Sequence, residues 1–346
     1  MADTLNVALV GYGYVGRVFH APLIAHTAGL RLHTIVSGDA GKVHADLPGA
    51  QVVGDPAAAF ADDAIDLVVI AAPNAVHAPL AIAALQAGRH VMVDKPFTTT
   101  LEEAGRVMDA ARGAGRIASV FQNRRWDADF LVLRALIDQG ALGDLAELHS
   151  HFDRFRPQVP DRWRERAGPG AGLWFDLGPH LVDQALQLFG MPDTIQADIG
   201  AQRADAVVDD FFHLVLRYGR LRVVLHAGSL VAANGPRFAA HGTRGSFVKH
   251  GLDPQEAALR DGVVPGSDGW GCDPQPGILT TIADGVPVPR TFEGPCGDYR
   301  ACYAAMRDAI LGRGEAPVTA AQALDVMRVL EAGLASAASG RAIAPG

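Results

Sequence analysis

The stretch LNVALVGYGYVG, residues 5–16, decides the fold of the first third of the chain. Six mainly apolar residues predict a buried strand, and the GxGxxG pattern that follows opens a helical stretch. In this pattern Gly11 permits a tight turn, Gly13 lets the backbone approach a pyrophosphate, and Gly16 allows close helix–strand packing. A glycine-rich turn without a ligand is the alternative, and the strand–helix context argues against it. We expect the cofactor-binding loop to comprise Gly11, Tyr12, Gly13, Tyr14, Val15 and Gly16.

Short β-branched runs alternate with alanine-rich helical stretches up to residue 121, which is typical of a parallel α/β sheet. Pro22 lies inside the first helical stretch and is expected to end one segment or start another. We therefore predict an α/β fold that begins with a Rossmann doubly wound parallel sheet over residues 1–122. The predicted strands are 5–10, 32–37, 51–53, 65–71, 90–93 and 117–121, and the predicted helices are 15–28, 78–87 and 102–114.

Longer segments with period-two alternation follow, and they predict a C-terminal α+β domain over residues 123–346 with a large, mostly antiparallel sheet. Residues 253–297 are rich in Gly, Pro and Asp and are predicted to form a long irregular excursion. The predicted strands are 146–155, 194–202, 211–218 and 222–229, and the predicted helices are 128–139, 176–189, 299–311 and 319–338.

Composition excludes several classes of function. The net charge of −8 gives no electrostatic footprint for nucleic acid, and no apolar run approaches the ~18 residues of a membrane span. Cys272, Cys296 and Cys302 are odd in number and lack CxxC spacing, so we expect neither a disulfide framework nor a structural zinc site. These features predict a soluble cytoplasmic protein without a bound metal.

The choice between NADP and NAD depends on the residues after the second predicted strand. NAD enzymes usually carry Asp or Glu there, whereas this chain has Ser37. Lys42 offers a nearby cation for a 2′-phosphate, and Asp39 argues for NAD if the turn directs it inward. We favour NADP and keep NAD as the alternative.

Lys95 follows the predicted strand 90–93, and in an open α/β sheet the carboxyl ends of strands line the cofactor crevice. An ammonium there can bond the substrate oxygen that gains or loses a proton, and Pro96 restricts its direction. The alternative is a solvated surface lysine.

Asp176 and His180 are four residues apart and share one face of the predicted helix. The carboxylate can set the imidazole tautomer and leave the other ring nitrogen to exchange a proton with substrate. The alternative is an N-terminal capping aspartate beside an ordinary surface histidine.

The remaining histidines carry weaker expectations. His77 follows the fourth predicted strand and is a candidate cofactor contact, whereas His20 is expected to be a packing residue. His149, His151 and Asp153 alternate along one predicted strand, where they line a polar pocket or form the polar face of the sheet. None of them has the spacing of a metal motif.

Several segments resemble the glucose–fructose oxidoreductase/inositol dehydrogenase (Gfo/Idh/MocA) family over essentially the whole chain. The family motifs are GYGYVG, Pro73-Asn74 with His77, DKPF at 94–97 and DLGPH at 176–180. The scyllo-inositol dehydrogenase branch is similar through residues 15–23, 123–127, 151–157 and 161–165.

This resemblance implies roles for named residues. It implies that Lys95, Asp176 and His180 are catalytic, that Arg124 contacts substrate, and that Asp153 and Trp163 do so more weakly. It also implies a large sheet that mediates a homodimer or homotetramer. The further cofactor contacts that it implies are the Ser37 region, Pro73, Asn74, His77 and Asp94. Lys42, Lys95 and Asn123 are also expected to contact the cofactor.

The leading hypothesis is hydride transfer between a nicotinamide and a secondary alcohol of a cyclic polyol or sugar, such as scyllo-inositol. In it His180 accepts the hydroxyl proton while Lys95 holds the same oxygen, and exchanging these two roles fits the sequence equally well. A non-catalytic dinucleotide-sensing regulator and a reductase of another carbonyl or imine, including a tetrapyrrole, are the alternatives.

Overall fold

The computed structural model describes residues 4–346, which form two compact units. The first unit contains the chain up to Asn123 together with Gln255–Trp270 and Asp298–Leu324. The second unit contains Arg124–Pro254, Gly271–Gly297 and Asp325–Gly346. The chain first passes between units within one residue of the expected position, but two later segments also belong to the first unit. Local sequence patterns do not show this return.

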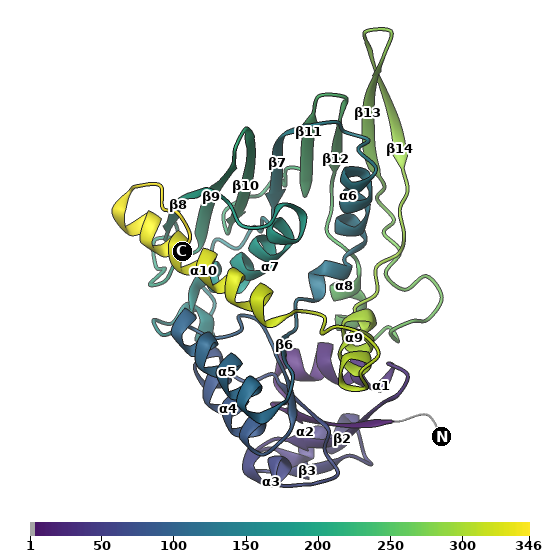
Figure 1. Cartoon of the computed structure of the whole chain (residues 1–346), viewed down its shortest axis with the longest axis vertical. Helices are drawn as coiled ribbons and strands as arrows, with labels where there is room; N and C mark the ends of the chain where they lie inside the picture. Colours follow the sequence, from purple (N-terminus) through teal and green to yellow (C-terminus); the bar gives the residue numbers. More distant parts are fainter. Residues whose placement is uncertain (1–3) are drawn as a thin grey trace. The chain divides into compact units, whose positions relative to one another are not determined.

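The first unit is built on a six-stranded parallel sheet with the order β3-β2-β1-β4-β5-β6 (Figure 1). This order, with its reversal beside β1, is that of the dinucleotide-binding fold. All six predicted strands are confirmed, with ends that differ by at most two residues. The strands are β1 (Leu5–Val10), β2 (Leu30–Val36), β3 (Gln51–Val53), β4 (Leu67–Ile70), β5 (His90–Val93) and β6 (Ala118–Val120).

Helices cover both faces of this sheet: α4 (His77–Gln86) and α5 (Leu101–Ala114) pack together on one, and α1 (Ala21–Ala25) packs with α9 (Arg300–Ile310) on the other (Figure 1). The helical stretch predicted over 15–28 ends at Ala25, and Pro22 lies at the start of a new segment as expected. A π-helical turn, η1 (Gly16–His20), precedes α1, and Pro22 lies in the first turn of α1, where its missing N–H costs nothing. The sequence analysis did not predict α2 (Ala40–Asp46), α3 (Pro56–Phe60) or α8 (Gln255–Arg260).

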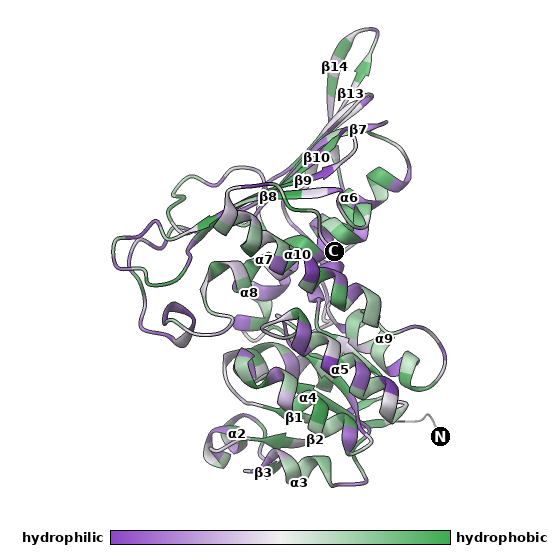
Figure 2. Ribbon diagram, turned by 60° about the vertical axis from the view of Figure 1, so that its left-hand side comes forward, coloured by the Kyte–Doolittle hydropathy of each residue, from purple (hydrophilic) through white to green (hydrophobic). Residues whose placement is uncertain are grey.

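The second unit is built on an eight-stranded sheet with the order β14-β13-β12-β11-β7-β10-β9-β8. The β7–β10 pair is parallel and the other neighbouring pairs are antiparallel. Figure 2 shows α6 (Ala128–Asp138), α7 (Gly172–Phe189) and most of α10 (Ala320–Ser339) on one face of the sheet. The strands are β7 (Leu145–His151), β8 (Thr194–Gly200), β9 (Phe211–Tyr218), β10 (Leu221–Gly228), β11 (Phe238–Gly242), β12 (Gly245–Lys249), β13 (Gly277–Ala283) and β14 (Val286–Phe292).

The irregular excursion predicted over 253–297 is wrong, because this segment contains α8 and the β13–β14 hairpin. Pro287 and Pro289 lie in β14, the edge strand, where a residue without an N–H is tolerated. The prolines and the exposed side chains of β14 hid the strand pattern.

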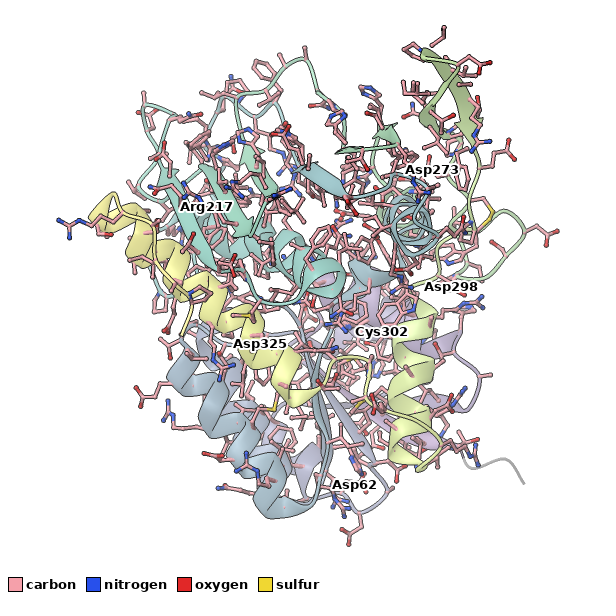
Figure 3. All side chains as sticks on the ribbon, turned by 45° about the horizontal axis from the view of Figure 1, so that its top comes forward. Asp62, Arg217, Asp273, Asp298, Cys302 and Asp325 are labelled. Carbon is pink, nitrogen blue, oxygen red and sulfur yellow. A yellow bond between two sulfur atoms is a disulfide. The ribbon has the colours of Figure 1, made fainter. Side chains whose placement is uncertain are left out.

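The expectation that the cysteines are unpaired is also wrong. Cys272 and Cys296 form a disulfide, which Figure 3 shows as a yellow bond beside the segment that carries Asp273. Cys302 is buried and forms no disulfide within residues 4–346. The cysteine count therefore no longer argues for a reducing compartment.

Across residues 4–346, no helix combines the length and the apolar composition that crossing a bilayer requires.

A distant carboxylate anchors the start of α7. The backbone N–H of Leu173 donates to the Asp209 carbonyl oxygen at 2.8 Å, and the N–H of Trp174 donates to Asp209 Oδ2 at 2.5 Å. Gly172 has a φ of +88°, and a Cβ there would overlap the Asp209 carboxylate. Gly178 packs directly against the Trp174 ring. These contacts fix the first two turns of α7.

We predict that Asp209 makes the stability of the protein fall as the pH rises. Burial raises its pKa to about 6 from 3.8, although the N–H groups of Trp174 and Leu173 act in the opposite direction. The folded state therefore binds this proton more tightly than the unfolded state, and the stabilisation is lost as the pH rises through 6. Measured by urea titration, the free energy of unfolding of the wild type should fall by about 2 kcal/mol between pH 4 and pH 7, relative to that of Asp209→Asn.

Asp205→Asn, in the exposed part of the same loop, is the control for the loss of one carboxyl group. Parallel pH profiles for the wild type and Asp209→Asn would contradict the prediction.

Candidate functional site

The glycine loop between β1 and η1 has the shape that a dinucleotide requires. Gly11 has a φ of +100°, and a Cβ at this residue would collide with the Ala71 carbonyl oxygen. A Cβ at Gly16 would collide with the carbonyl oxygen of Gly11, so both residues are needed for close packing. Gly13 is exposed and has open space where its Cβ would lie, while its carbonyl accepts a hydrogen bond from the N–H of Arg17 at 2.9 Å. The loop therefore fits a pyrophosphate at the start of η1.

The side chains of the glycine loop differ in burial and in their contacts. Tyr12 is buried, and its hydroxyl donates to Asp46 Oδ2 at 3.2 Å. Arg17 binds the same carboxylate at 2.6 and 2.9 Å. Burial raises the pKa of Tyr12 to about 12, so the hydroxyl remains a donor. Tyr12 thus ties the loop to the end of α2, whereas Tyr14 is exposed and Val15 half-buried.

The turn after β2 offers no carboxylate at the position that follows the strand. Ser37 is half-buried there, and its Oγ accepts the N–H of Asp39 at 3.1 Å. Asp39 Oδ1 accepts the N–H of Lys42 at 2.9 Å, which makes Asp39 the N-cap of α2. The Lys42 side chain is exposed. The one acidic residue of this turn is therefore engaged by the backbone.

His77 joins the loops that follow β4 and β5. Its ring is fully buried, with Nδ1 2.9 Å from the Pro96 carbonyl oxygen and Nε2 2.9 Å from the Ala72 carbonyl oxygen. The position of His77 after β4 predicted a cofactor contact, and no local pattern showed that its ring binds two backbone carbonyls. The same segment holds Pro73, which is exposed, and Asn74, which is buried. The ring therefore fixes the turn that carries Lys95.

Lys95 follows Asp94 at the carboxyl edge of the sheet. The N–H of Asp94 donates to the Ile70 carbonyl oxygen at 2.9 Å, which continues the β4–β5 pairing by one residue. Burial opposes the ionisation of Asp94, but the nearby His20, Lys95 and His77 outweigh it and lower its pKa. Lys95 itself is half-buried and precedes a cis peptide bond to Pro96.

His20, expected to be a packing residue, is fully buried against the Phe121 ring. Its Nδ1 lies 2.5 Å from the Tyr303 hydroxyl, and its Nε2 lies 3.8 Å from Asp94 Oδ1, too far for a direct hydrogen bond. Tyr303 comes from α9, in one of the segments that return to the first unit. His20 therefore packs in the core and also stabilises the charge of Asp94.

In the second unit, α7 carries Asp176 and His180 one helical turn apart, as predicted. His180 is buried and Asp176 half-buried. Asp176 also faces two guanidinium groups, Arg154 Nη1 at 3.4 Å and Arg164 Nε at 3.8 Å. Neither arginine was among the predicted site residues, although both lie in segments that carry the family resemblance.

A hollow rich in charged side chains opens beside Asp176. Arg203 is buried in its wall, bound to Asp210 at 2.7 Å and to Glu165 at 2.7 Å. Such a lining offers many donors and acceptors with nearly balanced charge. The residues that line it are Arg154, Arg156, Arg162, Arg164, Glu165, Gly172, Leu173, Asp176, Arg203, Asp209, Asp210 and Ser229.

The predicted substrate contacts occupy different environments. Arg124 is buried, with its guanidinium 4.7 Å from the Phe152 ring centroid and 3.3 Å from Asp127 Oδ2. Trp163 is largely exposed beneath the Arg164 guanidinium. Their contact with substrate stays a prediction.

Two other predicted contacts are buried or turned toward other groups. Asn123, a predicted cofactor contact, is buried at the end of the first unit. The Asp153 carboxylate lies 3.4 Å from His151 Nδ1 and 3.3 Å from His226 Nε2. Both residues' ligand contacts also stay predictions.

Two family models match the chain. The NAD-binding Rossmann fold of the GFO_IDH_MocA oxidoreductase family matches residues 5–122, and the C-terminal alpha/beta domain of that family matches residues 134–344.

Curated proteins and solved structures agree with these matches. The uncharacterized oxidoreductase YdgJ of Escherichia coli is 51% identical over 97% of each chain. The scyllo-inositol 2-dehydrogenase (NADP(+)) IolW of Bacillus subtilis is 40% identical over 99% of this chain and 96% of its own. The crystal structure of an oxidoreductase from Bacillus cereus is 33% identical and superposes with a TM-score of 0.91 over 99% of this chain and 98% of that one. With an intact dinucleotide loop and both domains matched, this chain belongs to the Gfo/Idh/MocA family of oxidoreductases.

Proposed function

We propose that this oxidoreductase transfers a hydride between a nicotinamide and a secondary alcohol of a cyclic polyol or sugar, with scyllo-inositol as the first substrate to test. One observation carries the proposal: the chain combines a glycine loop shaped for a dinucleotide with the DKPF and DLGPH motifs that carry Lys95, Asp176 and His180. The name of IolW, a relative over nearly the whole chain, supports an inositol as substrate.

The hollow beside Asp176 has room for about one water molecule, and the side chains around it can bond the hydroxyl groups of a neutral ligand at its edge. Five arginines are opposed by four carboxylates, so the wall lacks the strong positive excess that would favour a phosphate or a carboxylate. Ring hydroxyls can both donate to the carboxylates and accept from the guanidinium groups.

We propose that His180, Asp176 and Lys95 carry the proton chemistry. The imidazole of His180 accepts the hydroxyl proton, and Asp176 holds the ring in the tautomer that leaves one nitrogen free. The ammonium of Lys95 bonds the same substrate oxygen and stabilises the negative charge that develops on it. The bound nicotinamide supplies the hydride chemistry. In the reverse direction His180 returns the proton to a carbonyl oxygen.

We propose NADP as the cofactor. Ser37 places a neutral hydroxyl after β2, and the Asp39 carboxylate is occupied by the N-cap of α2. Lys42 is exposed on the first turn of α2, where it can attract a 2′-phosphate. The relative IolW is itself named as an NADP(+) enzyme.

We further propose that the chain works as a homodimer or homotetramer. The β13–β14 hairpin exposes large apolar side chains on both strands, which supports a contact between copies. These residues are Ile278, Ile282, Val286 and Val288.

Loss of either proton-handling group should abolish most of the turnover. We expect Lys95→Ala and His180→Ala each to lower kcat with scyllo-inositol by roughly 10²–10⁴-fold, the usual contribution of acid–base catalysis. NADP binding, measured by fluorescence of the reduced cofactor, should persist. Lys95→Arg separates the two possible roles of Lys95, because a guanidinium keeps the charge but does not give up its proton.

His241→Ala is the matched control, because His241 is a half-buried histidine of β11 that bonds Ser246 in its own hairpin. Full activity in Lys95→Ala or His180→Ala would refute the assignment. A wild type that binds cofactor but turns over no inositol or aldose would instead favour another carbonyl or imine substrate or a sensing role.

A new carboxylate after β2 should reverse the cofactor preference. We expect Ser37→Asp to raise the KM for NADP on the order of 100-fold, since two like charges in contact cost several kcal/mol. Ser37→Asn, equal in size and neutral, should change this KM little. Lys42→Ala should weaken the binding of NADP more than the binding of NAD. Equal effects of Ser37→Asp on NADP and NAD would contradict this account.

A further inference from the structure

Four side chains form a row across the face of the large sheet that lies opposite α7. In the strand registers Asp198 of β8 pairs with His213 of β9, His213 pairs with His226 of β10, and His226 pairs with His151 of β7. Directly paired residues of neighbouring strands point to the same face. In β7 the opposite face carries the buried Leu148 and Ser150. The histidines therefore share the more accessible face.

Asp153, two residues beyond the end of β7, brings a carboxylate to this row. Its Oδ2 lies 3.4 Å from His151 Nδ1, and its Oδ1 lies 3.3 Å from His226 Nε2. One ligand atom from each of the three residues lies within 4.8 Å of the other two. Two imidazole nitrogens and a carboxylate oxygen thus lie close together.

Each histidine nitrogen lies about as far from its nearest Asp153 oxygen, Oδ2 for His151 and Oδ1 for His226, as two ligand atoms of one metal ion lie from each other. Ligand atoms about 2.0–2.1 Å from a tetrahedral zinc ion lie roughly 3.3 Å from one another. A hydrogen bond between an imidazole and a carboxylate is shorter, about 2.7–2.9 Å. His149, two residues before His151, has such a short contact: its Nε2 lies 2.9 Å from Glu147 Oε1.

Outer contacts orient the ligand groups as they do in known metal sites. The Gly228 N–H donates to Asp153 Oδ1 at 3.1 Å. His226 Nδ1 lies 3.4 Å from His213 Nδ1, so the nitrogen of His226 that does not face Asp153 has a neighbour that can fix its tautomer. Such outer partners set the direction and the basicity of ligating imidazoles.

We infer that His151, Asp153 and His226 form a binding site for a divalent transition metal ion, with zinc as the ion to test. Two imidazole nitrogens and one carboxylate oxygen are ligands that zinc accepts, and three protein ligands leave a fourth position for water. The ion joins β7, the residues after it and β10. The sequence predicted no metal, because His226 lies far along the chain and forms no motif with His151.

The inference is independent of the proposed reaction. The family resemblance predicts that Asp153 contacts substrate. In the structure its carboxylate lies next to His151 and His226. The tests therefore vary the histidines and measure metal binding rather than turnover.

The experiment measures zinc binding to the full-length, untagged chain after treatment with a chelator. Competition with a chromophoric zinc chelator gives the affinity, and elemental analysis gives the stoichiometry. We expect one zinc per wild-type chain. His151→Ala and His226→Ala should each weaken binding by more than the 10–100-fold that the loss of an outer partner costs. The loss of zinc affinity in His213→Ala should lie within that 10–100-fold range.

His149→Ala and His241→Ala are matched controls from the same sheet and should bind zinc as the wild type does. His151→Gln and His226→Gln, which keep a polar side chain, replace the alanine variants if circular dichroism shows that those do not fold. Zinc should also raise the thermal midpoint of the wild type and leave that of the His226 variants unchanged. No zinc binding by the wild type, or equal losses in the control and ligand variants, would overturn the inference.

Discussion

The carboxyl ends of parallel strands must lie at one edge of a sheet, and the chemistry of the first unit depends on this constraint. The chain leaves β1, β2, β4 and β5 at that edge, so the glycine loop, Ser37, the Asn74 turn and Lys95 are gathered there from distant parts of the sequence. Packing then refines the edge. His77 connects the loops after β4 and β5 through two backbone carbonyls, and His20 stabilises the charge of Asp94 next to Lys95.

The second unit positions its groups by a different means. One helix, α7, carries both Asp176 and His180, and its start is fixed by Asp209 from a distant loop. Two arginines share the Asp176 carboxylate, so its negative charge offsets part of the positive charge beside the hollow. The opposite face of the large sheet carries the row of histidines around Asp153. The proposed chemistry and the inferred metal site therefore use different side chains of this unit.

Local patterns in the sequence were sufficient for the parallel sheet, the glycine loop and the helical spacing of Asp176 and His180. Each depends on residues that are close in the chain: an apolar run, three glycines at fixed intervals, and a four-residue repeat. The sequence did not reveal the partners of His77, the cap supplied by Asp209, or the arginines at Asp176. Those contacts join residues that only the folded chain brings together. The Cys272–Cys296 disulfide and the β13–β14 hairpin were missed for related reasons, because pairing over a long separation and an exposed, proline-containing edge strand leave no local signature.

The central proposal is that Lys95 and His180 act on one substrate oxygen. A double-variant cycle of kcat tests this most directly, because groups that act as a unit lose far less together than the product of their separate losses. The account predicts that Lys95→Ala/His180→Ala falls only slightly below the slower single variant, with the same cofactor affinity. A double variant whose loss equals the product of the two single losses would show that the two groups act independently, and would contradict the claim.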